Sequence, residues 1–150
     1  MNNLSLKGVF TGILFKSNGE VKTIRKSNKI LNVGLDFVCD AIANANSRPS
    51  PMQYIAVGSG TTAVAKEDTA LINEIARKEC TYIHTDGANE FSLEVTFGAG
   101  EAVGLIAEIG VCNASTGGIF IDRVVTSGFD KEESDIYKAI FEFTLEEKSV

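Results

Sequence analysis

Apolar and polar residues alternate along two segments of the chain, residues 90–97 and 137–145. Their apolar positions are Phe91, Leu93, Val95, Phe97, Tyr137, Ala139, Phe141, Phe143 and Leu145. A period of two places these side chains on one face of each strand. We therefore predict two strands that bury their aromatic faces in a common core.

Further segments with strand character are separated by turn residues. An Asn18-Gly19 pair favours a tight hairpin turn between residues 4–15 and 20–26. A second hairpin is expected from residues 105–112 and 119–126, which flank a turn at 113–118. Shorter strands are expected at residues 54–57 and 78–84.

One segment has helical spacing. Its apolar residues recur at intervals of three and four, at Leu31, Leu35, Val38, Ile42 and Ala45. Pro49 and Pro51 prevent its continuation. We also expect a brief helical turn at residues 68–72, capped by Asp68 or Thr69.

The fold class expected from these elements is mainly β: an antiparallel β-sandwich with one α-helix, residues about 31–45, packed on it. The chain is expected to form a single domain, 1–150, in which residues 30–146 make the sandwich with its helix. The N-terminal hairpin, residues 1–28, is expected to be an assembly element, because its first strand is apolar on both faces. The alternative is that both of these faces are covered within the monomer.

Composition describes an ordinary globular protein of 150 residues, with 44% hydrophobic and 23% charged residues. The net charge of -6 disfavours a nucleic-acid partner. The cations Lys22, Arg25, Lys26 and Lys29 form one cluster, which is interpreted as a solvated strand edge rather than a nucleic-acid patch.

Cysteine use and the N-terminal residues bear on the cellular compartment. Cys39, Cys80 and Cys112 are odd in number and widely spaced, so we expect reduced core residues rather than disulfides or a zinc site. The N-terminal residues lack the charged start and the long apolar stretch of a signal peptide. No apolar run approaches the ~20 residues of a membrane helix. We therefore expect the chain to fold in a cytoplasm and to have no membrane partner.

The glycine-rich segment and the candidate nucleophiles lack the sequence context that a catalytic or nucleotide-binding site needs. Gly58, Gly60 and Ala63 match a dinucleotide-binding spacing, but loop residues and hairpins follow where a helix and a parallel strand are required. An exposed, flexible loop is preferred. Ser59 lacks the spacing of a nucleophile elbow, and Cys112 lacks any surrounding motif.

Titratable candidates are equally sparse. His84 is the sole histidine and adjoins a turn at Asp86, so we expect a solvated side chain. Glu132, Glu133 and Asp135 lack the alternating spacing of a calcium loop. We predict no catalytic, cofactor-binding or metal-binding residues, no cofactor and no small-molecule substrate. Paired carboxylates of a small hydrolase stay open as an alternative, because their separation is set by the fold.

Three short runs resemble small tail or baseplate-associated proteins of bacteriophages: IAVGSGTTA at residues 55–63, DTAL at 68–71 and EIAR at 74–77. Residues 91–97, 107–113, 117–120 and 123–125 are similar to the same group, so the resemblance spans roughly 30–146.

The resemblance implies a non-enzymatic virion subunit of a phage tail or related contractile particle, in the baseplate, collar or fibre. Its expected partners are copies of itself, as a homo-oligomer, and other tail proteins, with assembly in the bacterial cytoplasm. A receptor- or carbohydrate-binding module of a tail fibre is the alternative.

Overall fold

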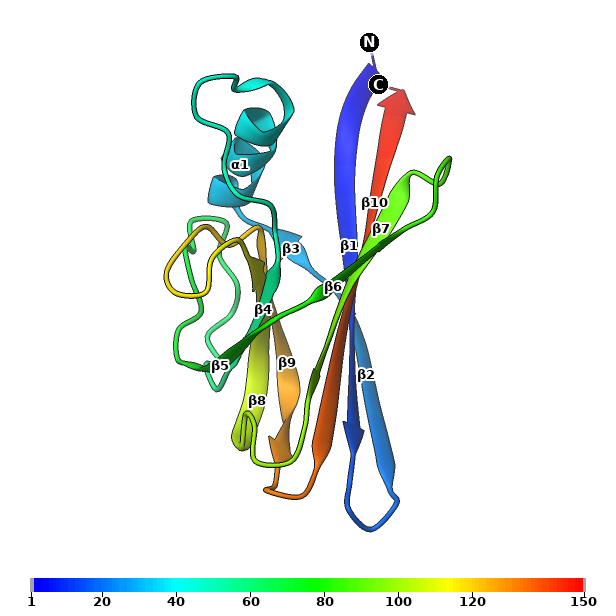
Figure 1. Ribbon diagram of the computed structural model, residues 1–150, viewed down its shortest axis with the longest axis vertical. Coiled ribbons are helices and arrows are strands. Elements are labelled where there is room, and N and C mark those ends of the chain that lie inside the picture. Colours follow the sequence, from blue (N-terminus) through cyan, green and yellow to red (C-terminus); the bar gives the residue numbers. More distant parts are fainter. Residues whose placement is uncertain (1, 150) are drawn as a thin grey trace.

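A computed structural model describes residues 2–149 and contains two five-stranded antiparallel sheets that face each other (Figure 1). The long sheet has the order β2-β1-β10-β7-β6 and the short sheet the order β3-β9-β8-β4-β5. The long sheet comprises β1 (Asn2–Phe15), β2 (Val21–Ser27), β6 (Thr81–His84), β7 (Glu90–Phe97) and β10 (Ile136–Ser149). The short sheet comprises β3 (Lys29–Ile30), β4 (Tyr54–Gly58), β5 (Glu74–Glu79), β8 (Gly104–Cys112) and β9 (Asp122–Lys131).

The antiparallel sandwich with one helix is confirmed. Its core lies between the sheets, where the alternating residues of β7 and β10 meet those of β4, β8 and β9. Phe141 is fully buried and its ring centroid lies 5.1 Å from that of Phe10. Leu93, Val95 and Phe143 are buried as the alternation predicts.

The N-terminal hairpin belongs to the sandwich. β1 pairs with β10 over its whole length, Asn2 to Phe15, and Phe10 and Leu14 are buried in the core. The expected boundary at residue 28 therefore does not separate the hairpin from the sandwich, because one face of β1 completes the core. The turn forms as predicted, with Gly19 at φ +91°, a conformation that favours glycine.

Two connections carry the chain from one sheet to the other. Residues 78–84 were expected to form one strand, but the chain leaves the short sheet after β5 and enters the long sheet as β6, with Cys80 between them. At the other side, Asn28 links β2 of the long sheet to β3 of the short sheet. Strands that switch sheets in this way partly close the sides of a sandwich.

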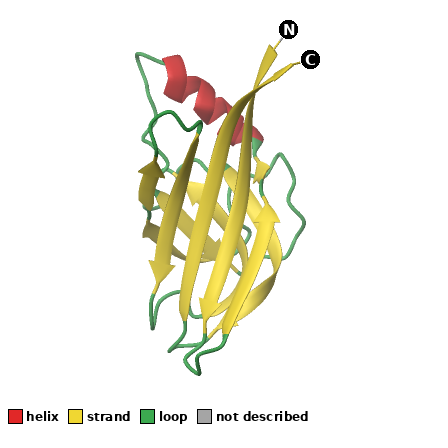
Figure 2. Ribbon diagram, turned by 90° about the vertical axis from the view of Figure 1, so that its right-hand side faces the viewer, coloured by secondary structure: helices red, strands yellow, loops and turns green. Residues whose placement is uncertain are grey.

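The helix α1 (Asn32–Ala43) confirms the predicted helical segment and lies across the top of the sandwich (Figure 2). Phe37 points into the core, and Gly34 packs so closely that a Cβ there would lie 2.8 Å from Cα of Ile121. The helical turn expected at residues 68–72 is wrong. Asp68 instead accepts a hydrogen bond from the backbone N–H of Ala65 at 3.0 Å.

The cysteines differ from the expectation in one position. Cys112 is buried and Cys80 half-buried, but Cys39 is exposed on α1. All three are free thiols, and burial raises the pKa of Cys80 and Cys112 to about 11. Both of these thiols therefore stay protonated at neutral pH.

Within residues 2–149, no helix is long and apolar enough to cross a membrane.

Candidate functional site

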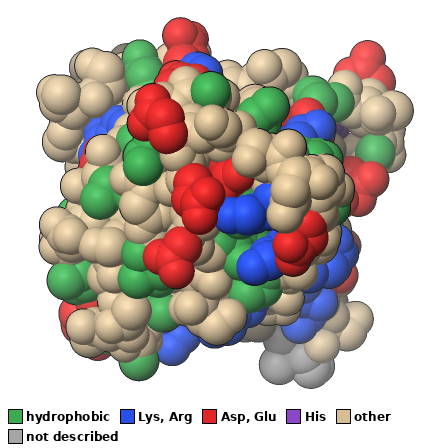
Figure 3. Space-filling view, turned by 90° about the horizontal axis from the view of Figure 1, so that it is seen from below, with side chains coloured by type: hydrophobic (Ala, Val, Ile, Leu, Met, Phe, Trp, Pro, Cys, Tyr) green, Lys and Arg blue, Asp and Glu red, His purple; other side chains and the backbone are tan. Residues whose placement is uncertain are grey.

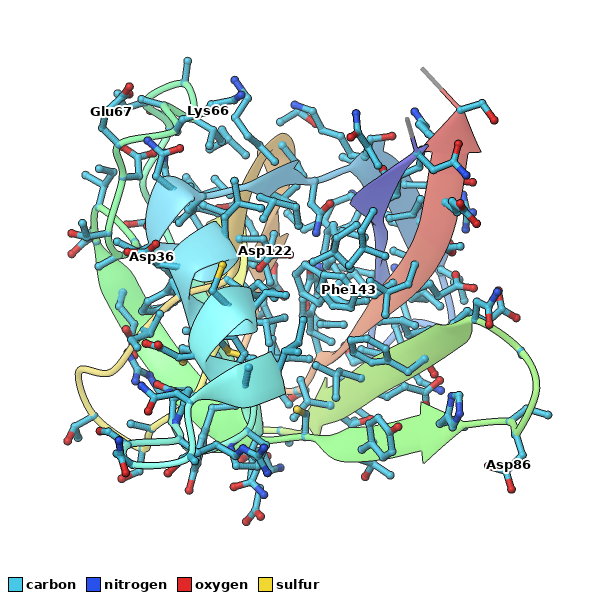
Figure 4. All side chains as sticks on the ribbon, turned by 90° about the horizontal axis from the view of Figure 1, so that it is seen from above. Asp36, Lys66, Glu67, Asp86, Asp122 and Phe143 are labelled. Carbon is cyan, nitrogen blue, oxygen red and sulfur yellow. The ribbon has the colours of Figure 1, made fainter. Side chains whose placement is uncertain are left out.

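An apolar groove lies at the top of the sandwich, between α1 and the upper part of the long sheet (Figure 4). Its volume is about 500 Å³, within the range of about 300–1,000 Å³ that is usual for ligand sites. Phe37, Val38, Ala41, Ile42, Pro49, Pro51 and Met52 line the helix side; Leu6, Tyr82, Phe91 and Leu145 line the sheet side. Arg48 is the charged residue of this lining.

The sheet wall of the groove is aromatic. The ring of Phe91 stacks on Phe143 with centroids 5.1 Å apart, and Tyr82 lies 5.8 Å from Phe91. Tyr82 is nevertheless 63% exposed, as is Ile42 on the opposite wall. These side chains offer an open apolar surface at one end of the molecule.

His84 follows Tyr82 on the same edge strand and is exposed, as expected from the neighbouring turn. Its Nδ1 lies 2.8 Å from the backbone oxygen of Glu90, and Asp86 lies 4.0 Å from its Nε2. The histidine therefore caps the hairpin between β6 and β7.

A buried charge cluster lies below the helix, in the short sheet. The guanidinium of Arg123 donates to Glu108 at 3.1 Å and to Asp68 at 3.0 Å, and Arg123 and Glu108 are fully buried. Arg123 also donates to the backbone oxygen of Thr62 at 3.0 Å. Burial alone would disfavour these charges, but their pairing and the additional hydrogen bonds stabilise them.

The glycine-rich loop is fastened to this cluster. Glu108 accepts hydrogen bonds from the backbone N–H groups of Ile72 at 3.2 Å and Asn73 at 3.1 Å. Gly60 is buried, and a Cβ there would collide with the Glu108 carboxylate and lie 2.7 Å from Cβ of Ile72. Residues 61–63 are exposed, as expected for an irregular loop, but Gly60 is buried, because close packing against Glu108 requires glycine at this position.

A second buried carboxyl lies where β2 crosses to β3. Asp122 accepts a hydrogen bond from the backbone N–H of Val111 at 2.9 Å and contacts the side-chain amide nitrogen of Asn28. Burial raises the pKa of Asp122 to about 7, although the hydrogen bonds from Val111 and Asn28 oppose the shift. Oδ1 of Asn28 is buried and has no hydrogen-bond partner among the described residues.

The bottom of the molecule carries paired charges (Figure 3). Asp135 accepts hydrogen bonds from the backbone N–H of Glu132 at 2.9 Å, the backbone N–H of Ser17 at 3.0 Å and Nζ of Lys16 at 3.1 Å. The Glu132 N–H is the main cause of the lowered pKa of Asp135, and Lys16 and Ser17 add to it. Asp135 thus fastens the β1–β2 turn to the β9–β10 turn.

The remaining acidic candidates stay apart. Glu132 and Glu133 are exposed beside Asp135, whereas Asp86 lies at the far turn of β6 and β7. Within residues 2–149, no three His, Cys, Asp or Glu side chains are grouped so that they could hold a metal ion.

Sequence reasoning singled out Gly58, Gly60 and Asp68 but missed Glu108 and Arg123. The signal was present: Glu108 is the sole charged residue in the apolar run 105–112, and Arg123 follows in the next strand. An acid that stays ionised inside a buried strand needs a partner such as a cation. The sequence alone does not show that the partner also holds the loop.

No family model, no curated protein and no solved structure matches this chain.

Proposed function

We propose that this protein is a structural subunit of a phage tail or phage-tail-like particle that acts through protein–protein assembly. The observation that carries the proposal is that residues of the glycine-rich segment, which resembles the phage proteins, pack inside the fold. Gly60 and Asp68 from that segment pack on Glu108 and Arg123, inside the fold. The segment that suggested a nucleotide site thereby serves to shape a rigid module.

The surface supports the same proposal. The long sheet ends in the edge strands β2 and β6, and the groove adds a continuous apolar area at one end. Exposed strand edges and apolar patches are the features through which β-proteins add neighbours.

The test is incorporation into a particle. A tagged copy, expressed in the cells that make the particle, should sediment with purified particles in a fixed ratio. Tyr82→Glu and Ile42→Glu should reduce incorporation, whereas Asp36→Lys, on the exposed side of α1, should not. Absence of the protein from the particles would contradict the proposal.

A binding module is the second candidate, and the groove is the observation that favours it. Its lining is apolar apart from Arg48, so it suits an apolar ligand or receptor segment better than a sugar. Titration with an apolar fluorescent probe should then saturate at one site and be weakened by Phe37→Ala or Ala41→Trp.

A further inference from the structure

One edge strand of the long sheet is basic, and acids flank the other. Residues 21–29, which form β2 and the start of β3, contain four cations, Lys22, Arg25, Lys26 and Lys29, and no acid. Residues 79–90, which include β6 and its turn, contain no lysine or arginine and three acids: Glu79 at the end of β5, Asp86 in the turn and Glu90 at the start of β7. All seven side chains are exposed. In a protein of net charge -6, the β2 edge is a local basic strip.

The two edges also differ in their protection against strand addition. β2 carries lysines, which discourage pairing with another copy of itself. β6 has neither lysine nor proline, and its four residues are all exposed, with Tyr82 at 63% and Ile83 at 46%. An exposed apolar edge of this kind is a template for a further strand.

We propose that the β6 edge of one copy pairs with the β2 edge of another, extending the long sheet from copy to copy. This inference rests on the proposed assembly function and names the partner as a second copy of this chain. The contact is heterologous, because it joins two different edges. Repetition therefore gives a ring where the rotation closes and a filament where it does not.

The sheet register places suitable side chains together. Lys22 and Lys26 stand opposite Leu14 and Phe10, so they lie on the core-facing side of β2. Tyr82 stands opposite Leu93 and lies on the core-facing side of β6. A continuous sheet keeps this side common to both copies, so the lysines meet the Tyr82 ring and the turn that carries Asp86. Glu90 lies on the other side of the sheet, the side of Arg25 on β2.

Symmetric pairing is disfavoured by the same charges. Two β2 edges would bring lysines and arginines together, and two β6 turns would bring Asp86 and Glu90 together. Like charges at close range oppose both arrangements, whereas the mixed pairing joins opposite charges.

The experiment measures mass in solution by size-exclusion chromatography with light scattering at about 0.15 M and about 1 M salt. The 16.1 kDa chain should run as a multimer larger than a dimer at the lower salt and dissociate at the higher salt. K22E/K26E and D86K/E90K should each run as monomers with unchanged melting temperature. D36K/E67K, which makes the same change in net charge as D86K/E90K on exposed side chains outside β2 and β6 (Figure 4), should keep the multimer.

Mixing the K22E/K26E variant with the D86K/E90K variant is the decisive test. Each then meets opposite charge at both of its edges, so the mixture should regain the multimer. A monomeric wild-type protein, a dimer that survives both edge substitutions, or a mixture that stays monomeric would overturn the inference. A monomeric protein that still enters particles would leave the proposed function standing and remove only this contact.

Discussion

Replacing Asp122 with asparagine should stabilise the protein at alkaline pH. The carboxyl is fully buried and its pKa is raised to about 7 by burial, from a usual value of 3.8. A raised pKa means that the folded state holds its proton more tightly than the unfolded state. The stabilising contribution is complete below pH 3.8 and is lost as the pH rises through about 7.

The magnitude follows from the difference between the two pKa values. Each unit corresponds to 1.36 kcal/mol, so the shift from 3.8 to about 7 amounts to about 4 kcal/mol between acid and alkaline solution. For a chain of 150 residues that is roughly 10 °C in melting temperature. Asparagine does not titrate, and its oxygen can accept the hydrogen bond from Val111. Its nitrogen then replaces the oxygen that Nδ2 of Asn28 contacts, so the Asn28 amide has to turn over and present its unpaired Oδ1 as the acceptor.

The assay compares wild type and Asp122→Asn by urea unfolding at about pH 4.5 and about pH 8.5, on either side of the main change. Circular dichroism suits the measurement, because the chain has no tryptophan. The stability difference between the two proteins should move in favour of the variant as the pH rises. A difference that is the same at both pH values would refute the reasoning, since it would mean that Asp122 titrates alike in the folded and unfolded chain.

Three further predictions concern other buried groups. Asp135→Asn should destabilise the protein at neutral pH, because the pKa of Asp135 is lowered in the folded state. The difference in unfolding free energy from wild type should shrink as the pH falls below the usual carboxyl pKa, and the same urea series measures it. Gly60→Ala should cost about 1–3 kcal/mol, because its Cβ collides with the fixed Glu108 carboxylate; an unchanged melting temperature would show that the loop can move aside. Phe141→Ala should cost about 3–5 kcal/mol in a thermal melt, whereas alanine at exposed Glu142 should cost little.

The strands and the core could be predicted where local pattern decides the outcome. Phe91, Leu93, Val95 and Phe97 alternate so regularly that only one face can enter the core, and Asn18-Gly19 fixes the first turn. The switch of sheets at Cys80 was missed, because residues 78–84 were expected to form one strand and no local residue marks the crossing.

The candidate site depended on contacts between distant residues. Asp68 was assigned a capping role, a local interaction, but a buried guanidinium 55 positions away competes for its carboxylate. A charge-assisted bond to a desolvated partner outweighs an exposed helix cap. Likewise, the groove arises from α1 and β1, β6, β7 and β10, segments that no sequence pattern brings together.

Strand length explains why the groove exists. β1 and β10 have 14 residues each, whereas β8 and β9 have nine and ten. At about 3.3 Å per residue, the long sheet extends roughly 15 Å beyond the short sheet. The 12-residue helix α1 covers this overhang from one side without filling the space beneath it. The core-facing apolar pattern of β1 and β10 continues past the core to Leu6 and Leu145, so the overhang presents apolar side chains to solvent at the end of the sandwich that carries both chain termini.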